Sequence, residues 1–315
     1  MPLTLTVKAL LSFIFVCSLV FLFAMLAVYA VSPVAPKINP VKKSATTSFD
    51  KGLIRYHYEI APNKPTILLL HGFNNQLSSW DSLTKEISSF ASILRLDIPG
   101  YGESDWSTND YTLPTQAKRI VVLLDQLEIK KVHIAGGSMG GSLTAWIAAH
   151  YPERVHSALL MAPSGYPDSL LYPGLFGLMV KPGLVNKLAF KLTDTPFYQW
   201  AFPKSKALQA TSVTSSYGEP WKAALPNIKA PTVIMWSVGD YGVPFEKSTE
   251  VNKLIPNSIL LSLPKEVGHA IGGKSSLTLV INVLKQLIDQ KSLSEIANSS
   301  SLIEHSLLHP KQMNK

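Results

Sequence analysis

The sequence predicts an α/β fold built on a mostly parallel sheet. Short apolar runs that are typical of buried strands alternate along the chain with longer segments of helical pattern. The strand-like runs are continuously apolar, as expected where helices cover both faces of a parallel sheet. A content of 46% hydrophobic and 16% charged residues supplies enough apolar side chains for such a core.

The first segment predicts a membrane anchor. Residues 9–31 include no charged side chain, and about 23 residues in a helix extend about 34 Å, enough to cross a bilayer core. We therefore expect one N-terminal transmembrane helix at 1–31 and a single-pass membrane localisation. Val28-Tyr29-Ala30 also resembles a cleavage site, so a cleaved signal peptide is the alternative. The charge pattern leaves the side of the membrane open.

A proline-containing linker at 32–49 leads into the predicted domain. Predicted strands lie at 53–60, 66–70, 92–96, 132–135, 155–161, 232–236 and 258–263. Predicted helices lie at about 77–91, 114–128, 139–150, 244–255 and 275–290. Strands thus alternate with helices through most of the chain, as in a parallel sheet with helical crossovers.

One long insertion interrupts this alternation. Residues 164–230 are rich in proline and aromatic side chains and have no strand character. An excursion of this length predicts a short helical cap on the domain. The domain is then expected at 50–292, and the polar segment at 293–315 is expected to be a flexible tail.

The pentapeptide Gly136-Gly137-Ser138-Met139-Gly140 directly follows the predicted strand at 132–135. It fits the G-x-S-x-G nucleophile elbow, in which a serine sits on a strained turn between a strand and a helix. Glycine neighbours allow the strand and the helix to approach closely there. A glycine-rich turn without chemistry is the alternative, but the strand and helix on either side favour Ser138 as a candidate nucleophile.

A serine nucleophile needs a base, an acid that orients the base, and donors for the developing oxyanion. Asp240 and His269 each follow a predicted strand at the end where parallel sheets bind ligands. They are the candidate acid and base. Asp97 competes as the acid, but its place before a Pro-Gly turn favours a backbone-capping role.

The candidate oxyanion donors are two backbone N–H groups. One belongs to Phe73 in the turn His71-Gly72-Phe73, and the other to Met139, which follows the nucleophile. The imidazole of His71 itself is interpreted as a hydrogen-bonded loop side chain without a catalytic role.

Together these motifs, in the order Ser138, Asp240, His269, resemble the α/β-hydrolase family. The resemblance covers about residues 50–290. It implies an eight-stranded, mostly parallel sheet flanked by helices, with the cap inserted after the sixth strand. The N-terminal anchor together with a serine elbow is similar in architecture to membrane-anchored monoacylglycerol lipases.

The resemblance implies a serine esterase or lipase. We expect hydrolysis of carboxylic esters, lipid-like or with another apolar acyl group, through an acyl-enzyme on Ser138. The same fold and order of residues serve C–C bond hydrolases and cofactor-free peroxidases, which remain alternatives. A non-catalytic binding protein of the same fold is a further alternative, against which the three intact residues argue.

Other partners are not expected from the sequence. The net charge is +8, but the basic residues are scattered and form no nucleic-acid motif. No His, Asp or Glu cluster has the spacing of a metal site, and no phosphate-binding glycine motif is present, so neither a metal nor a cofactor is predicted. The expected partners are a small apolar ester and the membrane, and the oligomeric state is left open.

Overall fold

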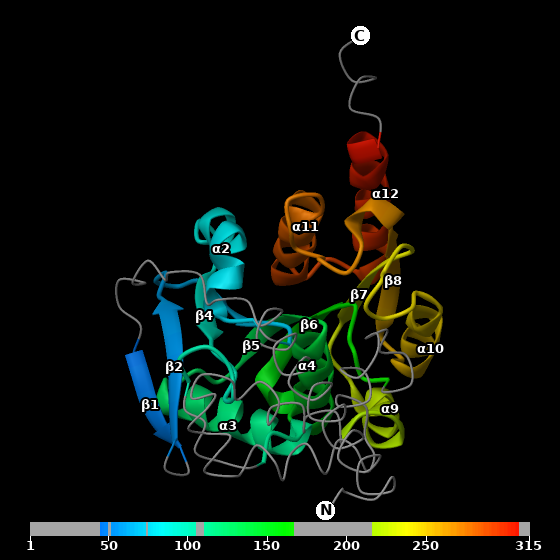
Figure 1. Cartoon of the computed structure of the whole chain (residues 1–315). Helices are drawn as coiled ribbons and strands as arrows, with labels where there is room; N and C mark the ends of the chain where they lie inside the picture. Colours follow the sequence, from blue (N-terminus) through cyan, green and yellow to red (C-terminus); the bar gives the residue numbers. More distant parts are fainter. Residues whose placement is uncertain (1–44, 50–51, 74, 105–109, 167–215, 309–315) are drawn as a thin grey trace, which may run out of the picture.

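The computed structural model describes residues 45–49, 52–73, 75–104, 110–166 and 216–308. Within these ranges the chain forms an eight-stranded sheet with helices on both faces (Figure 1). The strands are β1 Ala45–Phe49, β2 Gly52–Glu59, β3 Thr66–Leu70, β4 Ser92–Leu96, β5 Val132–Gly137, β6 Val155–Met161, β7 Thr232–Ser237 and β8 Ser258–Leu263.

The strand order is β1-β2-β4-β3-β5-β6-β7-β8. All pairs from β4 to β8 are parallel. The pairs β1–β2 and β2–β4 are antiparallel and form one edge of the sheet. The predicted mostly parallel sheet is therefore confirmed, with β2 to β8 as its body and β1 as an added edge strand.

The central strands are buried on both faces. Every residue of β3, β4 and β7 is buried, which explains why their sequences are mostly apolar. Leu68, Leu69 and Leu70 are inaccessible to solvent. Each such leucine contributes about 2 kcal/mol of hydrophobic stabilisation relative to an exposed one.

The predicted helices are present in the described ranges. They are α2 Asp81–Ile87 with the preceding 3₁₀ turn η1 Leu77–Trp80, α3 Leu113–Gln126, α4 Met139–His150, α10 Glu246–Leu254 and α11 Leu277–Ile288. Helices α3 and α4 contact each other on one face of the sheet, and α2 and α11 contact each other on the other face (Figure 1). Helix α4 begins directly after Ser138, which places the serine at a helix N-terminus.

The structure corrects both predicted ends of the domain. The sheet begins with β1 at Ala45–Phe49, inside the predicted linker at 32–49, because its threonines and phenylalanine favour an edge strand. Helix α12 spans Leu293–Leu308, where a flexible tail was expected. This helix contacts α11 and β8, and its Ile296 is fully buried.

A capping box at the start of α12 explains that helix. The Glu295 carboxylate accepts a hydrogen bond from the Ser292 backbone N–H, at 2.9 Å, and the Glu295 N–H donates to Ser292 Oγ at 3.3 Å. These reciprocal bonds satisfy two backbone N–H groups at the first turn, where a helix has no carbonyl partners for its N–H donors. The polar composition of the segment instead favoured the prediction of a flexible tail.

The predicted membrane localisation is corrected by the structure. In the part of the chain that is described, no helix is both long and apolar enough to cross a membrane. Helix α4 is apolar, but its 12 residues extend about 18 Å, well short of the ~30 Å of a bilayer core. The predicted anchor at 1–31 lies outside the described residues.

The predicted cap at 164–230 lies mostly outside the described residues, which resume at residue 216. Its last part contains the short helix α9 Glu219–Ala224 and the 3₁₀ turn η5 Leu225–Asn227. Helix α9 packs on α4, and its Trp221 is fully buried. The end of the predicted cap is thus part of the main core.

Candidate active site

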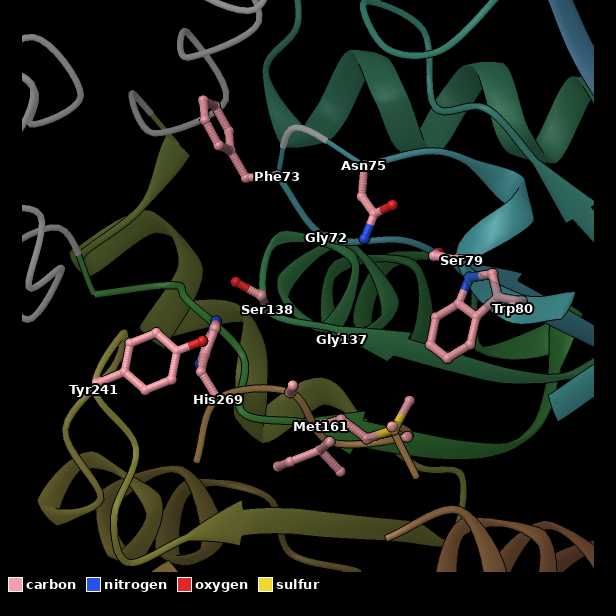
Figure 2. A pocket seen from close by; sticks show the side chains of 14 residues that line it. Gly72, Phe73, Asn75, Ser79, Trp80, Gly137, Ser138, Met161, Tyr241 and His269 are labelled. Carbon is pink, nitrogen blue, oxygen red and sulfur yellow. The ribbon is translucent and has the colours of Figure 1, made fainter. Parts of the chain in front are cut away.

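A pocket of about 360 Å³ lies at the carboxyl ends of the parallel strands (Figure 2). Its walls include Phe73 after β3, Ser138 after β5, Met161 at the end of β6, Tyr241 after β7 and His269 after β8. Five neighbouring strands therefore direct side chains to one place, as expected for ligand sites of open parallel sheets.

Ser138 has the strained backbone of a nucleophile elbow. Its φ of 53° and ψ of −116° are rare for a residue with a Cβ atom. The Ser138 N–H donates to Met161 O at 2.8 Å, which ties the turn to β6. A Cβ at Gly136 would lie 2.3 Å from Gly140 O, and one at Gly140 would lie 2.1 Å from Leu70 O. Glycines are required at both positions for the strand and helix to meet.

Asp240 and His269 form a direct hydrogen-bonded pair. His269 Nδ1 lies 2.9 Å from Asp240 Oδ1 and 2.8 Å from Oδ2. The Asp240 side chain is fully buried, and its Oδ1 also accepts from the N–H groups of Gly242 and Val243 at 2.7 and 2.8 Å. With Nδ1–H donated to the carboxylate, a neutral imidazole has its lone pair on Nε2.

Two neighbouring residues restrict the imidazole of His269. The ring of Tyr241 meets it edge to face, with centroids 6.0 Å apart. A Cβ at Gly242 would lie 2.9 Å from His269 Cγ, so the backbone of this loop passes close to the ring. These contacts leave the imidazole 18% exposed, and the exposed part lines the pocket.

Ser138 lies on the same side of the pocket as His269 and Tyr241 (Figure 2). The structure describes no hydrogen bond between the Ser138 and His269 side chains. It therefore pairs two of the three predicted residues directly and places the third beside them in one cavity. Catalytic hydrogen bonds often tighten only when substrate is bound.

The two predicted oxyanion donors lie on either side of Ser138. The Gly72-Phe73 turn passes next to Ser138, since a Cβ at Gly72 would lie 3.5 Å from Ser138 Cβ. Met139 is the first residue of α4, where backbone N–H groups and the helix dipole favour negative charge. The role of both N–H groups stays a prediction.

His71 is a structural side chain, as the sequence indicated. It is fully buried, its Nδ1 donates to Gly72 O at 2.8 Å, and its Nε2 accepts from Ile98 N at 3.0 Å. Burial lowers the pKa of His71, which keeps the ring neutral. This imidazole therefore holds the His71-Gly72-Phe73 turn against the loop after β4.

Asp97 also has the backbone-capping role that its sequence context favoured. Its carboxylate accepts from the N–H groups of Leu77 and Glu103, at 2.7 and 2.9 Å. The guanidinium of Arg55 lies 3.2 Å from it. Because these partners occupy the buried carboxylate, Asp97 does not compete with Asp240 as the partner of His269.

Several residues that line the pocket were not predicted from the sequence. Tyr241 lines the pocket and is 70% exposed. Its position next to Asp240 in the sequence could have indicated that it lies at the site. Asn75, Ser79 and Trp80 line the opposite side of the pocket. These three residues follow the oxyanion turn within one short segment, but no motif marks them.

A network behind the nucleophile was also not foreseen. Ser138 O accepts from Ser164 N at 3.2 Å, and Ser164 Oγ lies 2.9 Å from the Tyr217 hydroxyl. Trp221 Nε1 donates to Ser142 O in the first turns of α4 at 3.0 Å. These bonds attach the elbow to the segments on both sides of residues 167–215. Among the described residues, no His, Cys, Asp or Glu cluster could hold a metal ion.

Comparisons with known proteins agree with this geometry. The sequence profile of the alpha/beta hydrolase fold family matches residues 65–216. Monoacylglycerol lipase ABHD6 of Bos taurus is 37% identical over 242 residues, covering 66% of this chain and 71% of the lipase. The 2-hydroxy-6-oxo-6-phenylhexa-2,4-dienoate hydrolase of Burkholderia cepacia is 28% identical over 269 residues, covering 74% of this chain and 93% of that hydrolase.

Among solved structures, the enol-lactonase from Burkholderia xenovorans LB400 is similar to this chain. It has a TM-score of 0.63 at 18% sequence identity, covering 78% of this chain and 100% of the lactonase. At this level of identity the similarity concerns the fold alone.

Proposed function

The chain belongs to the α/β hydrolase fold family, and on this premise we propose that it hydrolyses carboxylic esters. Ser138 is the proposed nucleophile, His269 the base and Asp240 the carboxylate that orients the base. The observation that supports this most is the Asp240–His269 pair, at 2.8 Å, in the same pocket as a serine on a strained elbow.

In the first half of the reaction, Ser138 Oγ attacks the ester carbonyl carbon while His269 Nε2 takes the hydroxyl proton. Asp240 keeps Nδ1–H in place and stabilises the imidazolium that forms. The N–H groups of Phe73 and Met139 are proposed to donate to the tetrahedral oxyanion. Such a donor contributes about 3 kcal/mol to transition-state stabilisation.

The intermediate then collapses as its bond to the alcohol oxygen breaks. His269 returns the proton to that oxygen, and the alcohol leaves an acyl group on Ser138. In the second half, water attacks the acyl carbonyl and gives its proton to His269, which protonates Ser138 Oγ as the acid departs. The reaction consumes one water molecule and yields the alcohol and the carboxylic acid.

The pocket favours an ester with an apolar group. Trp80, Met161 and Ile271 contribute apolar side chains to its lining. We propose lipid-like or other apolar acyl esters as the substrate class, and the similarity to a monoacylglycerol lipase supports this choice. The choice does not depend on a membrane.

Labelling with a fluorophosphonate tests the proposal. This reagent modifies serines that a neighbouring base activates, so we expect covalent labelling of Ser138, located by peptide mass spectrometry. The variant Ser78→Ala, which changes a nearby serine outside the pocket, serves as the control and should label normally. Absence of labelling at Ser138 in the folded protein would reject the ester hydrolase.

C–C bond hydrolysis is the second candidate. The dienoate hydrolase from Burkholderia cepacia, which is covered over 93% of its length, supports this reading. Both reactions use the same three residues, so fluorophosphonate labelling does not separate them. Assays of an ester panel beside a 2-hydroxy-6-oxo-dienoate do, because the preferred substrate has the higher kcat/KM.

A further inference from the structure

The side of the pocket opposite His269 combines an apolar wall with three polar groups. Asn75, Ser79 and Trp80 all line the cavity there, and all lie on the segment that follows the oxyanion turn (Figure 2). The proposed ester hydrolysis uses only the apolar surface of Trp80 and gives the polar groups of these three residues no role. Their hydrogen-bonding capacity therefore indicates what else the pocket recognises.

Asn75 presents a donor to the pocket. Its Oδ1 accepts from the Gln76 backbone N–H at 2.9 Å, which fixes the orientation of the amide. The remaining amide atom is Nδ2, which Figure 2 shows directed into the pocket. No hydrogen bond joins this nitrogen to a described residue, so its N–H groups are available to a ligand.

Ser79 presents an acceptor. Its Oγ donates its single proton to Gln76 O at 2.8 Å, and the side chain is exposed at the pocket wall. With the proton used, only lone pairs of this oxygen remain for a ligand. The backbone of Gln76 thus leaves Asn75 as a hydrogen-bond donor toward the pocket and Ser79 as an acceptor.

Trp80 adds a second donor. The residue is only 6% exposed, and its Nε1–H is buried without a hydrogen-bond partner. Figure 2 shows this nitrogen on the side of the indole that faces Ser79. A buried unpaired donor is unfavourable and uncommon, and a ligand acceptor would relieve it.

We propose that Asn75, Ser79 and Trp80 form a subsite for an uncharged hydroxyl group of the substrate. Two donors and one acceptor match an alcohol, which accepts two hydrogen bonds and donates one. A carboxylate matches less well, because it would face the lone pairs of Ser79, and no Lys or Arg is among the described residues lining the pocket. This subsite rests on the proposed ester hydrolysis.

Three esters test the subsite and show which part of the substrate carries the hydroxyl. Ethyl butyrate is the reference, 2-hydroxyethyl butyrate has a hydroxyl on the alcohol part, and ethyl 3-hydroxybutyrate has one on the acyl part. We expect the wild type to prefer one of the hydroxylated esters by about two- to tenfold in kcat/KM, the range for a neutral hydrogen bond.

The variants Asn75→Asp, Ser79→Ala and Trp80→Phe should each reduce this preference toward one. Asn75→Asp keeps the acceptor for Gln76, and Trp80→Phe keeps an aromatic wall. The ratio of two esters measured on one preparation does not depend on the folded fraction. Ser78→Ala makes the same change as Ser79→Ala outside the pocket, so it should retain the wild-type ratio.

The outcomes separate the two proposals. Equal kcat/KM values of the wild type for all three esters would overturn the subsite and leave ester hydrolysis standing. A preference that persists in all three variants would also overturn it. Hydrolysis of none of the esters would reject the proposed function, and the subsite with it.

Discussion

At the residue scale, the site depends on how firmly one imidazole is held. His269 donates to a carboxylate that two backbone N–H groups also hold, and Tyr241 and Gly242 restrict its ring. A base held in this way loses little entropy when it takes the serine proton. The same local argument separates His269 from His71, whose two ring nitrogens are both occupied by backbone groups.

A second histidine gives a prediction on pH. His133 in β5 is 6% exposed, and burial together with the neighbouring His156 lowers its pKa from 6.5 to about 4. Between these values the unfolded chain binds more protons than the folded chain, so the free energy of unfolding rises with pH. We expect His133 to account for a loss of about 2–3 kcal/mol between pH 6.5 and pH 4.

Urea unfolding at several pH values checks this contribution. The variant His133→Asn should show a smaller decrease in unfolding free energy from pH 6.5 to pH 4 than the wild type. His150 lies at the exposed end of α4, so His150→Asn is the matched control and should keep the wild-type slope. A His133→Asn protein with an unchanged slope would contradict the assignment.

At the element scale, the elbow depends on how closely β5 and α4 approach each other. Gly136 and Gly140 each lack room for a Cβ, whereas a Cβ at Gly137 would meet no atom within 4 Å. Neighbouring glycines of one motif therefore have different roles. Gly136 is required for the close approach of β5 and α4, whereas Gly137 borders open space.

This difference predicts unequal effects of two alanine substitutions on stability. Gly136→Ala forces its Cβ against backbone atoms and should reduce the free energy of unfolding by about 1–3 kcal/mol or more. Gly137→Ala should change it by less than about 0.5 kcal/mol. Denaturant unfolding of the two variants makes the comparison, and equal stabilities would argue against the close packing of β5 on α4.

The secondary-structure elements differ in how well the sequence predicts them. Strands β2 to β8 and most helices were predictable, because each has a largely apolar run or a helical period of its own. Helix α12 was not, because Ile296 gains its stabilisation from contacts with distant elements. Its signal was the pair Ser292 and Glu295, a capping box that composition obscures.

At the scale of the whole molecule, the parallel sheet brings distant residues together. Ser138, Asp240 and His269 were identifiable as candidates because each follows a strand, and parallel strands share one edge for their ends. Asn75, Ser79 and Trp80 were not, since their polarity toward the pocket depends on bonds to Gln76 and on burial. The membrane localisation predicted from apolarity alone was wrong for the structure described.

The proposed function requires Ser138 and His269 to act as one catalytic unit, and ester kinetics measure this dependence. Hydrolysis of ethyl butyrate should fall by about 10⁴–10⁶ in kcat in Ser138→Ala and in His269→Ala, with the double variant little worse than either. Such non-additivity is expected because neither residue works without the other. A folded Ser138→Ala protein with near-wild-type kcat would show that Ser138 is not the nucleophile.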